Sequence, residues 1–223
     1  MLTALLGLCQ SITCFSYSVD HGGECRLKLG RRKYACHLTL DPDTAHPNLI
    51  LSEGNRKVTL VEENQHYEDH PDRFDCHPHI LCREGLSGSR YYWEVERDCG
   101  MAVIGVVYKG MKRKGWGDDS NIGDNRKSWC LVSSHSGYHC SARGYLFNHA
   151  GVRRTIPRPD SKRVGVYLDW PAGTLSFYSV SSSGTLTHLH TEHTTFTEPL
   201  YPGFRIYSSS VTLCQIDDQH IQR

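Results

Sequence analysis

The sequence of 223 residues lacks the features of several broad protein classes. No stretch of a dozen residues keeps apolar side chains at the spacing of an amphipathic helix, so we expect little helix. The formal net charge is only +1, which provides no general attraction to nucleic-acid phosphates or to anionic membranes. The apolar run near the N-terminus is well short of the roughly 20 residues that a membrane span needs. We therefore expect neither nucleic-acid binding nor a membrane span.

Catalytic motifs are also missing. The sequence contains no Gly-x-Ser-x-Gly nucleophile elbow, no phosphate-binding loop and no dinucleotide-binding glycine pattern. Asp118 and Asp119 form a carboxylate pair, but adjacent acids on a glycine-flanked loop are typical of solvated turns. We therefore expect no enzyme activity and no cofactor.

Cysteine and histidine could instead suggest disulfides or a metal. The 10 cysteines are scattered over a chain larger than the small secreted domains that depend on disulfides, which indicates free thiols and a cytoplasmic protein. The segment Cys76–Cys82 has the composition of a zinc site, but an extended chain places its cysteines and histidines on opposite faces. His188, His190 and His193 form a second cluster, for which exposed strand positions are expected. We predict no metal.

The N-terminal region differs from the rest of the chain. Residues 1–18 carry no charge and contain a short apolar run, and they are interpreted as an N-terminal extension or a possible signal-like segment, although a basic leading region is missing. Residues 19–33 are predicted to be a linker, residues 34–217 the folded domain and residues 218–223 a C-terminal tail. One large β domain suits this length.

Short strand-like runs separated by turn residues fill the rest of the chain, and many such strands indicate an all-β antiparallel sandwich. The predicted strands are Lys57–Val61, Ile80–Arg83, Arg90–Arg97, Ala102–Tyr108, Trp129–Ser133, Tyr138–Ala142, Val164–Asp169, Thr174–Val180, Leu186–Thr191, Gly203–Ile206 and Val211–Ile216.

Alternation assigns faces to two of these strands. Trp93 and Val95 share one face and Glu94 and Glu96 the other, which is typical of a half-buried strand. Val164, Val166 and Leu168 likewise point one way, and the hairpin that follows turns at Pro171-Ala172-Gly173. We expect Trp93 and Leu168 to lie in one shared core.

Several segments together resemble a known family. They are Leu40-Asp41-Pro42, Asp72-Arg73-Phe74, Leu81-Cys82-Arg83-Glu84-Gly85-Leu86-Ser87-Gly88, Tyr92-Trp93-Glu94-Val95-Glu96, Leu168-Asp169 and Pro199-Leu200-Tyr201-Pro202-Gly203-Phe204. In this order they are similar to a PRY-SPRY (B30.2) domain. The resemblance implies a bent, concanavalin-like sandwich that binds proteins through loops at one end. Segments 19–24 and 31–41 resemble the junction that precedes this domain in fish NOD-like receptors.

The loops are therefore where we expect binding. The segment 109–127 is long and glycine-rich and carries Trp116 amid charges of both signs, which is typical of a protein-binding hot spot. The candidate partner-binding residues are Tyr67, Asp72, Arg113, Trp116, Asp118, Tyr138, His139, Tyr145, Trp170 and Phe196. We predict a protein-recognition module in innate immunity with an unidentified protein partner; the alternative is a secreted lectin-like or toxin-like β-sandwich.

Overall fold

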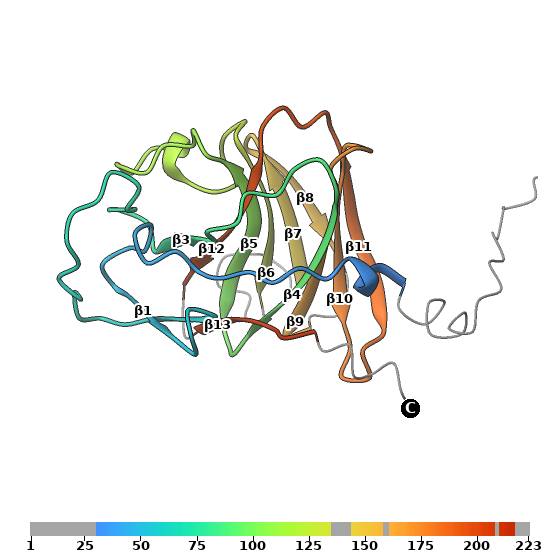
Figure 1. Ribbon diagram of the computed structural model, residues 1–223, viewed down its shortest axis with the longest axis horizontal. Coiled ribbons are helices and arrows are strands. Elements are labelled where there is room, and N and C mark those ends of the chain that lie inside the picture. Colours follow the sequence, from blue (N-terminus) through green and yellow to red (C-terminus); the bar gives the residue numbers. More distant parts are fainter. Residues whose placement is uncertain (1–29, 135–143, 158–160, 208–209, 217–223) are drawn as a thin grey trace, which may run out of the picture.

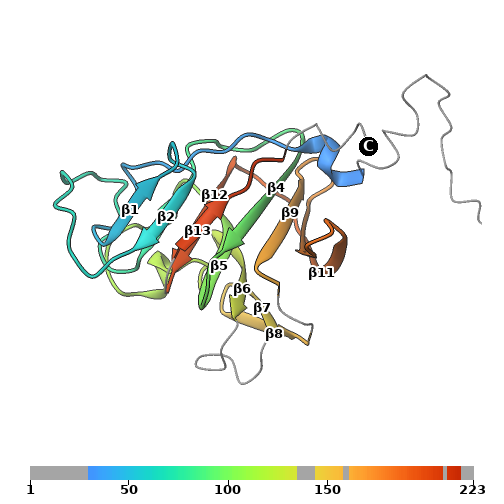
Figure 2. The same ribbon diagram turned by 90° about the horizontal axis from the view of Figure 1, so that it is seen from below.

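A computed structural model describes residues 30–134, 144–157, 161–207 and 210–216. Two antiparallel sheets face each other (Figures 1 and 2). The seven-stranded sheet has the order β1 (Leu49–Ser52), β2 (Lys57–Leu60), β13 (Ser210–Leu213), β4 (Arg90–Arg97), β9 (Arg163–Asp169), β10 (Thr174–Val180) and β11 (Leu186–His193). The six-stranded sheet has the order β3 (His79–Leu81), β12 (Leu200–Ile206), β5 (Met101–Tyr108), β6 (Ser128–Ser134), β7 (Gly144–His149) and β8 (Val152–Ile156).

Helix is scarce, as predicted. The described residues contain two short 3-10 helices, η1 (Gly30–Tyr34) and η2 (Asp118–Ser120). No helix in the described ranges is both long enough and apolar enough to cross a membrane. The all-β sandwich expected from the sequence is confirmed.

The main core lies between the sheets and follows the predicted alternation. Trp93 of β4 is 2% exposed and Leu168 of β9 is fully buried, and both belong to one cluster of apolar side chains. The hairpin from β9 to β10 turns at the predicted place, where Gly173 has a φ of +66° that glycine adopts without strain. A Cβ at Gly173 would also collide with the Thr194 carbonyl, so the turn requires glycine.

Ten of the eleven predicted strands overlap strands of the structure, including β5, which is buried at every position and shows no alternation. The bounds of β4 and β10 match the prediction, whereas β1, β7 and β8 were not predicted. The residues of β8 are almost all exposed, because β8 pairs only with β7 at the sheet edge and buries no face. Its pairing comes from the backbone, which leaves no hydrophobic pattern in the sequence. The predicted strand Tyr138–Ala142 lies outside the described residues.

The burial of Glu94 differs from the expectation for a half-buried strand. The face of β4 opposite Trp93 was expected to be polar and exposed, but Glu94 is 2% exposed. Tyr92, Arg32 of η1 and Arg163 of β9 all contact its carboxylate and cover it. The alternation is correct in direction, but other polar side chains bury the outward face at this point.

A second, smaller core lies on the outer face of the six-stranded sheet. The long connection between β5 and β6 folds back over this face, and Ile122 and Met111 from the connection are 3% exposed there. Their apolar neighbours are Phe74, Leu81, Val103, Val107 and Cys130. This core fixes the connection that carries Trp116.

Candidate partner-binding site

Two connections distant in sequence meet beside the six-stranded sheet. They are residues 61–78 between β2 and β3 and residues 109–127 between β5 and β6, which lie on the same side of the molecule in Figure 1. Lys114 Nζ lies 3.2 Å from Asp69 Oδ1, and the Gly115 backbone N–H donates to Asp75 Oδ1 at 2.9 Å. The two connections therefore form one surface.

We name this surface the Trp116 surface and define it by Asp69, Asp75, His77, Lys114, Trp116 and Asp118. Trp116 is its most prominent member, with 75% of the residue exposed. Its indole ring packs edge-on against the ring of His77, with 5.1 Å between the ring centroids. Trp116 thus exposes a large apolar side chain to solvent while His77 supports its ring from one side. This arrangement suits an anchor residue in a protein interface.

Arg113 supports the loop from beneath. The residue is 8% exposed, and its guanidinium donates to the carbonyl oxygens of Met111 and Lys109, the latter at 3.1 Å. The guanidinium carbon also lies 5.1 Å from the centre of the Phe74 ring. These contacts hold the loop before any partner arrives, and a loop already ordered loses less conformational entropy on binding.

The histidines below Trp116 are neutral at physiological pH. Burial lowers the pKa of His77, and nearby Arg205 lowers it further. His79 is fully buried, and burial holds its pKa well below the usual value, with Arg205 and His77 acting in the same direction. His77 and His79 therefore add no positive charge to the Trp116 surface.

A hollow of about 700 Å³ adjoins the Trp116 surface at Asp118. Its charged lining residues are Lys112, Asp118, Asp119, Asp124, Arg126 and Lys127. Asn125 fixes one wall, because its side-chain amide donates to the carbonyl oxygens of Asp118 at 3.0 Å and Asn121 at 2.8 Å. The mixture of both charge signs fits the polar rim of a protein interface better than a site for a polyanion.

The predicted site residues fall into groups. Trp116 and Asp118 lie on the Trp116 surface, and Asp72 is half-buried in the adjoining connection. Tyr67 lies in the same connection, but its hydroxyl donates to the Leu49 carbonyl at 2.6 Å and its ring packs on the main core. Arg113 lies beneath the surface, as described above.

The remaining predicted residues are placed elsewhere. Tyr145 is 2% exposed in the core, and its hydroxyl accepts the Ser161 N–H at 2.8 Å. Phe196 is 4% exposed and packs edge-on against Trp129. Trp170 is half-buried, and its indole N–H donates to the Glu198 carbonyl at 3.4 Å. Tyr138 and His139 lie outside the described residues.

Sequence reasoning did not select Asp69, Asp75, His77 or Lys114 as members of the site. The contacts from Asp69 to Lys114 and from Asp75 to Gly115 span 45 and 40 residues, so no local pattern could pair them. His77 and His79 were considered only as metal ligands or packing residues. In the described part of the chain, no group of three or more Cys, His, Asp or Glu side chains could hold a metal ion.

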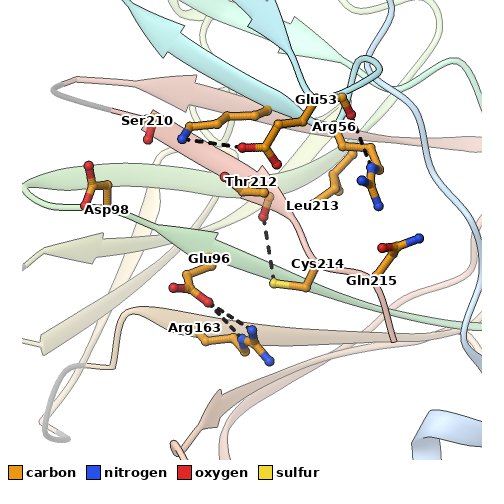
Figure 3. A pocket seen from close by; sticks show the side chains of 11 residues that line it. Glu53, Arg56, Glu96, Asp98, Arg163, Ser210, Thr212, Leu213, Cys214 and Gln215 are labelled. Atoms are coloured by element: carbon orange, nitrogen blue, oxygen red, sulfur yellow. Dashed lines mark hydrogen bonds and ion pairs between the residues drawn. The ribbon is translucent and has the colours of Figure 1, made fainter. Parts of the chain in front are cut away.

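A second hollow lies on the outer face of the seven-stranded sheet (Figure 3). It is a groove of about 420 Å³ that crosses β2, β13, β4 and β9. Arg163 donates to Glu96 from two nitrogens at 3.0 and 3.2 Å on one side of it. Cys214 borders the same groove, and burial raises the pKa of its thiol to about 11.

Comparison with known proteins identifies the sandwich. Residues 38–86 match the SPRY-associated domain PRY, and residues 90–216 match the SPRY domain. The chain is 47% identical to stonustoxin subunit beta of Synanceia horrida over 78% of its length, and the match covers 24% of that protein. It is 36% identical to tripartite motif-containing protein 14 of Mus musculus over 81% of its length, and the match covers 40% of that protein. The chain thus spans less than half the length of these relatives.

Solved structures agree with this assignment. The stonustoxin structure superimposes with a TM-score of 0.71 at 41% identity, covering 82% of this chain and 28% of that one. The TRIM65 PSpry domain superimposes with a TM-score of 0.75 at 24% identity, covering 90% of this chain and 100% of that one, which shows the shared fold. The PRY and SPRY matches together extend from Leu38 to Ile216, and the chain therefore belongs to the family of PRY-SPRY domain proteins.

Proposed function

We propose that this chain is a protein-recognition module that binds its partner through the Trp116 surface. The observation that carries the proposal is Trp116 itself, which is 75% exposed on a loop held by Asp69, Asp75 and Arg113. Hot spots of protein interfaces favour tryptophan and arginine on ordered supports. Membership of the SPRY family supports the same class of function, since these domains are protein-interaction modules.

We propose further that the partner belongs to innate immune sensing in the cytoplasm. Support comes from the resemblance of segments 19–24 and 31–41 to the junction found in fish NOD-like receptors. The sequence relatives reported above are stonustoxin subunit beta and tripartite motif-containing protein 14, so the likeness to NOD-like receptors stays a prediction. No catalytic step is assigned to the chain.

The test compares partners captured by the full chain and by the Trp116→Ala chain from cells of the source organism. Val152→Ala is the matched control, because Val152 is also an exposed apolar residue, 59% exposed, but lies on the edge strand β8. We expect a partner that the wild-type and Val152→Ala chains retain and the Trp116→Ala chain loses by at least tenfold. Equal capture by all three chains would contradict a role for the Trp116 surface.

A second candidate function is a recognition domain within a secreted toxin-like protein. The 47% identity to stonustoxin subunit beta over 78% of this chain favours it. Expression of the full chain in animal cells separates the two candidates. Recovery from the medium with a shortened N-terminus supports the toxin-like function, whereas retention in the cytoplasm supports the first proposal.

A further inference from the structure

A carboxylate is buried on the outer face of the seven-stranded sheet, away from the Trp116 surface. Glu94 is 2% exposed, and the Tyr92 hydroxyl donates to its Oε1 at 2.7 Å. Arg32 of η1 reaches the same oxygen with Nε and Nη2, both at 2.8 Å. Arg163 of β9 lies 3.3 Å from the other oxygen. A residue from outside both sheets thus completes the site around Glu94.

A second arginine, Arg31, packs against two tyrosine rings near Glu94. The guanidinium carbon of Arg31 lies 4.7 Å from the ring centre of Tyr178 and 5.5 Å from that of Tyr167. These tyrosines belong to the neighbouring strands β10 and β9. Arg31 and Arg32 therefore enter one site with two kinds of contact, an aromatic wall and a buried acid.

The sheet is shaped to hold this arrangement. Gly165 of β9 lies opposite Glu94 in the strand register, and a Cβ at Gly165 would come within 2.6 Å of the Tyr92 hydroxyl oxygen. Because Gly165 has no side chain, the Tyr92 ring has the space it needs to reach Glu94. We name the site formed by Tyr92, Glu94, Arg163, Tyr167 and Tyr178 the arginine cradle.

Charge balance shows what the cradle lacks without η1. The carboxylates of Glu94 and Glu96 carry two negative charges, and Arg163, which contacts both, carries one positive charge. Without η1, the two carboxylates therefore share the single positive charge of Arg163. Arg32 supplies a second positive charge directly at Glu94, and a carboxylate as buried as Glu94 needs such a partner.

We propose that the arginine cradle is a binding site for a protein segment with two adjacent arginines, and that residues 30–34 of the chain occupy it as a built-in competitor. The side chains of Arg31 and Arg32 make the contacts of the occupant with the cradle, and the Tyr34 hydroxyl accepts from Arg90 at 3.0 Å beside it. Arg32 has 27% of its side chain exposed, and Arg31 and Lys33 are exposed at the surface. A basic segment of a partner would displace η1 and make the same contacts.

Arginine is preferred to lysine for geometric reasons. Glu94 Oε1 accepts from two nitrogens of one guanidinium, and the planar guanidinium of Arg31 stacks on tyrosine faces. An ammonium group offers a single point charge and cannot form the paired contact. The cradle also adjoins the groove of Figure 3, because Arg163 belongs to both and contacts Glu96 in the groove, so a longer segment could continue across β4 and β13.

The test empties the cradle in the full chain. Fluorescent peptides Gly-Arg-Arg-Lys-Tyr and Gly-Lys-Lys-Lys-Tyr are titrated against the wild-type chain, the Arg31→Ser/Arg32→Ser chain and the same chain with Glu94→Gln added. We expect the arginine peptide to bind the doubly substituted chain at least tenfold more tightly than the wild-type chain. We expect the lysine peptide to bind the doubly substituted chain at least fivefold more weakly than the arginine peptide, and Glu94→Gln to abolish the gain.

Three results would overturn the proposal: equal binding of the arginine peptide to the wild-type and emptied chains, equal binding of both peptides, or a gain that survives Glu94→Gln. Circular dichroism confirms that each chain is folded. If the double substitution prevents folding, the Arg32→Gln chain replaces it, since it keeps Arg31 over Tyr178, and the same order of affinities is expected.

Discussion

Tyr92 lies against Gly165 of the neighbouring strand, and this close approach lets its hydroxyl reach Glu94 at 2.7 Å. The two residues belong to β4 and β9, and their positions follow from the register that sets Glu94 opposite Gly165. Burial raises the pKa of Tyr92, and the bond to Glu94 raises it further, so the hydroxyl keeps its proton and acts as the donor. A buried polar cluster of this kind tolerates little change in volume.

Gly165→Ala is therefore expected to destabilise the domain by about 1–3 kcal/mol, because overpacking forces Tyr92 away from Glu94. Chemical denaturation measures the loss. Adding Tyr92→Phe removes the hydroxyl that the new Cβ would contact at 2.6 Å. The cost of Gly165→Ala should then fall in the Tyr92→Phe background. An equal cost in both backgrounds would show that the Tyr92 hydroxyl is not the obstacle.

Truncation of two tryptophans should change the free energy of unfolding by very different amounts. Trp116 is 75% exposed, so Trp116→Ala should change the free energy of unfolding by less than about 1 kcal/mol. Trp129 is 3% exposed between Tyr108 and Phe196, so Trp129→Ala should cost about 3–5 kcal/mol. Thermal and denaturant unfolding measure both. A large loss with Trp116→Ala would make that residue part of the fold and not of the binding surface.

Stability should fall as the pH drops below about 6.5, the ordinary histidine value. Burial, and then Arg205, hold the pKa of His79 well below that value in the folded chain. On acidification the unfolded chain therefore binds a proton at His79 that the folded chain does not bind. Stability is therefore complete above the unfolded pKa and decreases on acidification, by at most about 1.4 kcal/mol per pH unit for each such histidine. His46, His77 and His190 act in the same direction, because burial lowers the pKa of each.

Unfolding curves between pH 5 and 7.5 test this expectation. The His79→Leu chain should lose part of the slope, whereas His37→Asn, at an exposed histidine, serves as the control for removing any histidine. Identical slopes in the wild-type and His79→Leu chains would contradict the assignment to His79.

Thiol reactivity should separate two of the six described free cysteines. Cys99 is exposed in the turn between β4 and β5, whereas burial raises the pKa of Cys214 to about 11. Because the thiolate is the reactive form, Cys214 should react at least tenfold more slowly at pH 7.5. Timed iodoacetamide labelling with peptide mapping by mass spectrometry gives each rate. Comparable rates would mean that the groove of Figure 3 leaves Cys214 open to reagents.

The candidate site was only partly predictable. Trp116 stood out because a large aromatic residue in a glycine-rich, charged loop has no neighbouring apolar pattern to bury it, and the structure leaves it 75% exposed. Arg113 has a similar local sequence, yet it is 8% exposed beneath the loop. Whether a loop side chain turns outward depends on residues far along the chain, in this case Phe74.

The fold class and the faces of the regular strands follow from the amino-acid sequence. Period-two alternation placed Trp93 and Leu168 in one interior, because a strand with one apolar face must bury it against another sheet. Tertiary structure alone decided the burial of Glu94, whose partners Arg32 and Arg163 lie 62 and 69 residues away. It also decided the meeting of Asp75 with Gly115 across 40 residues. Local patterns record which face of a strand is apolar, but contacts between polar groups arise only when packing brings distant segments within hydrogen-bonding distance.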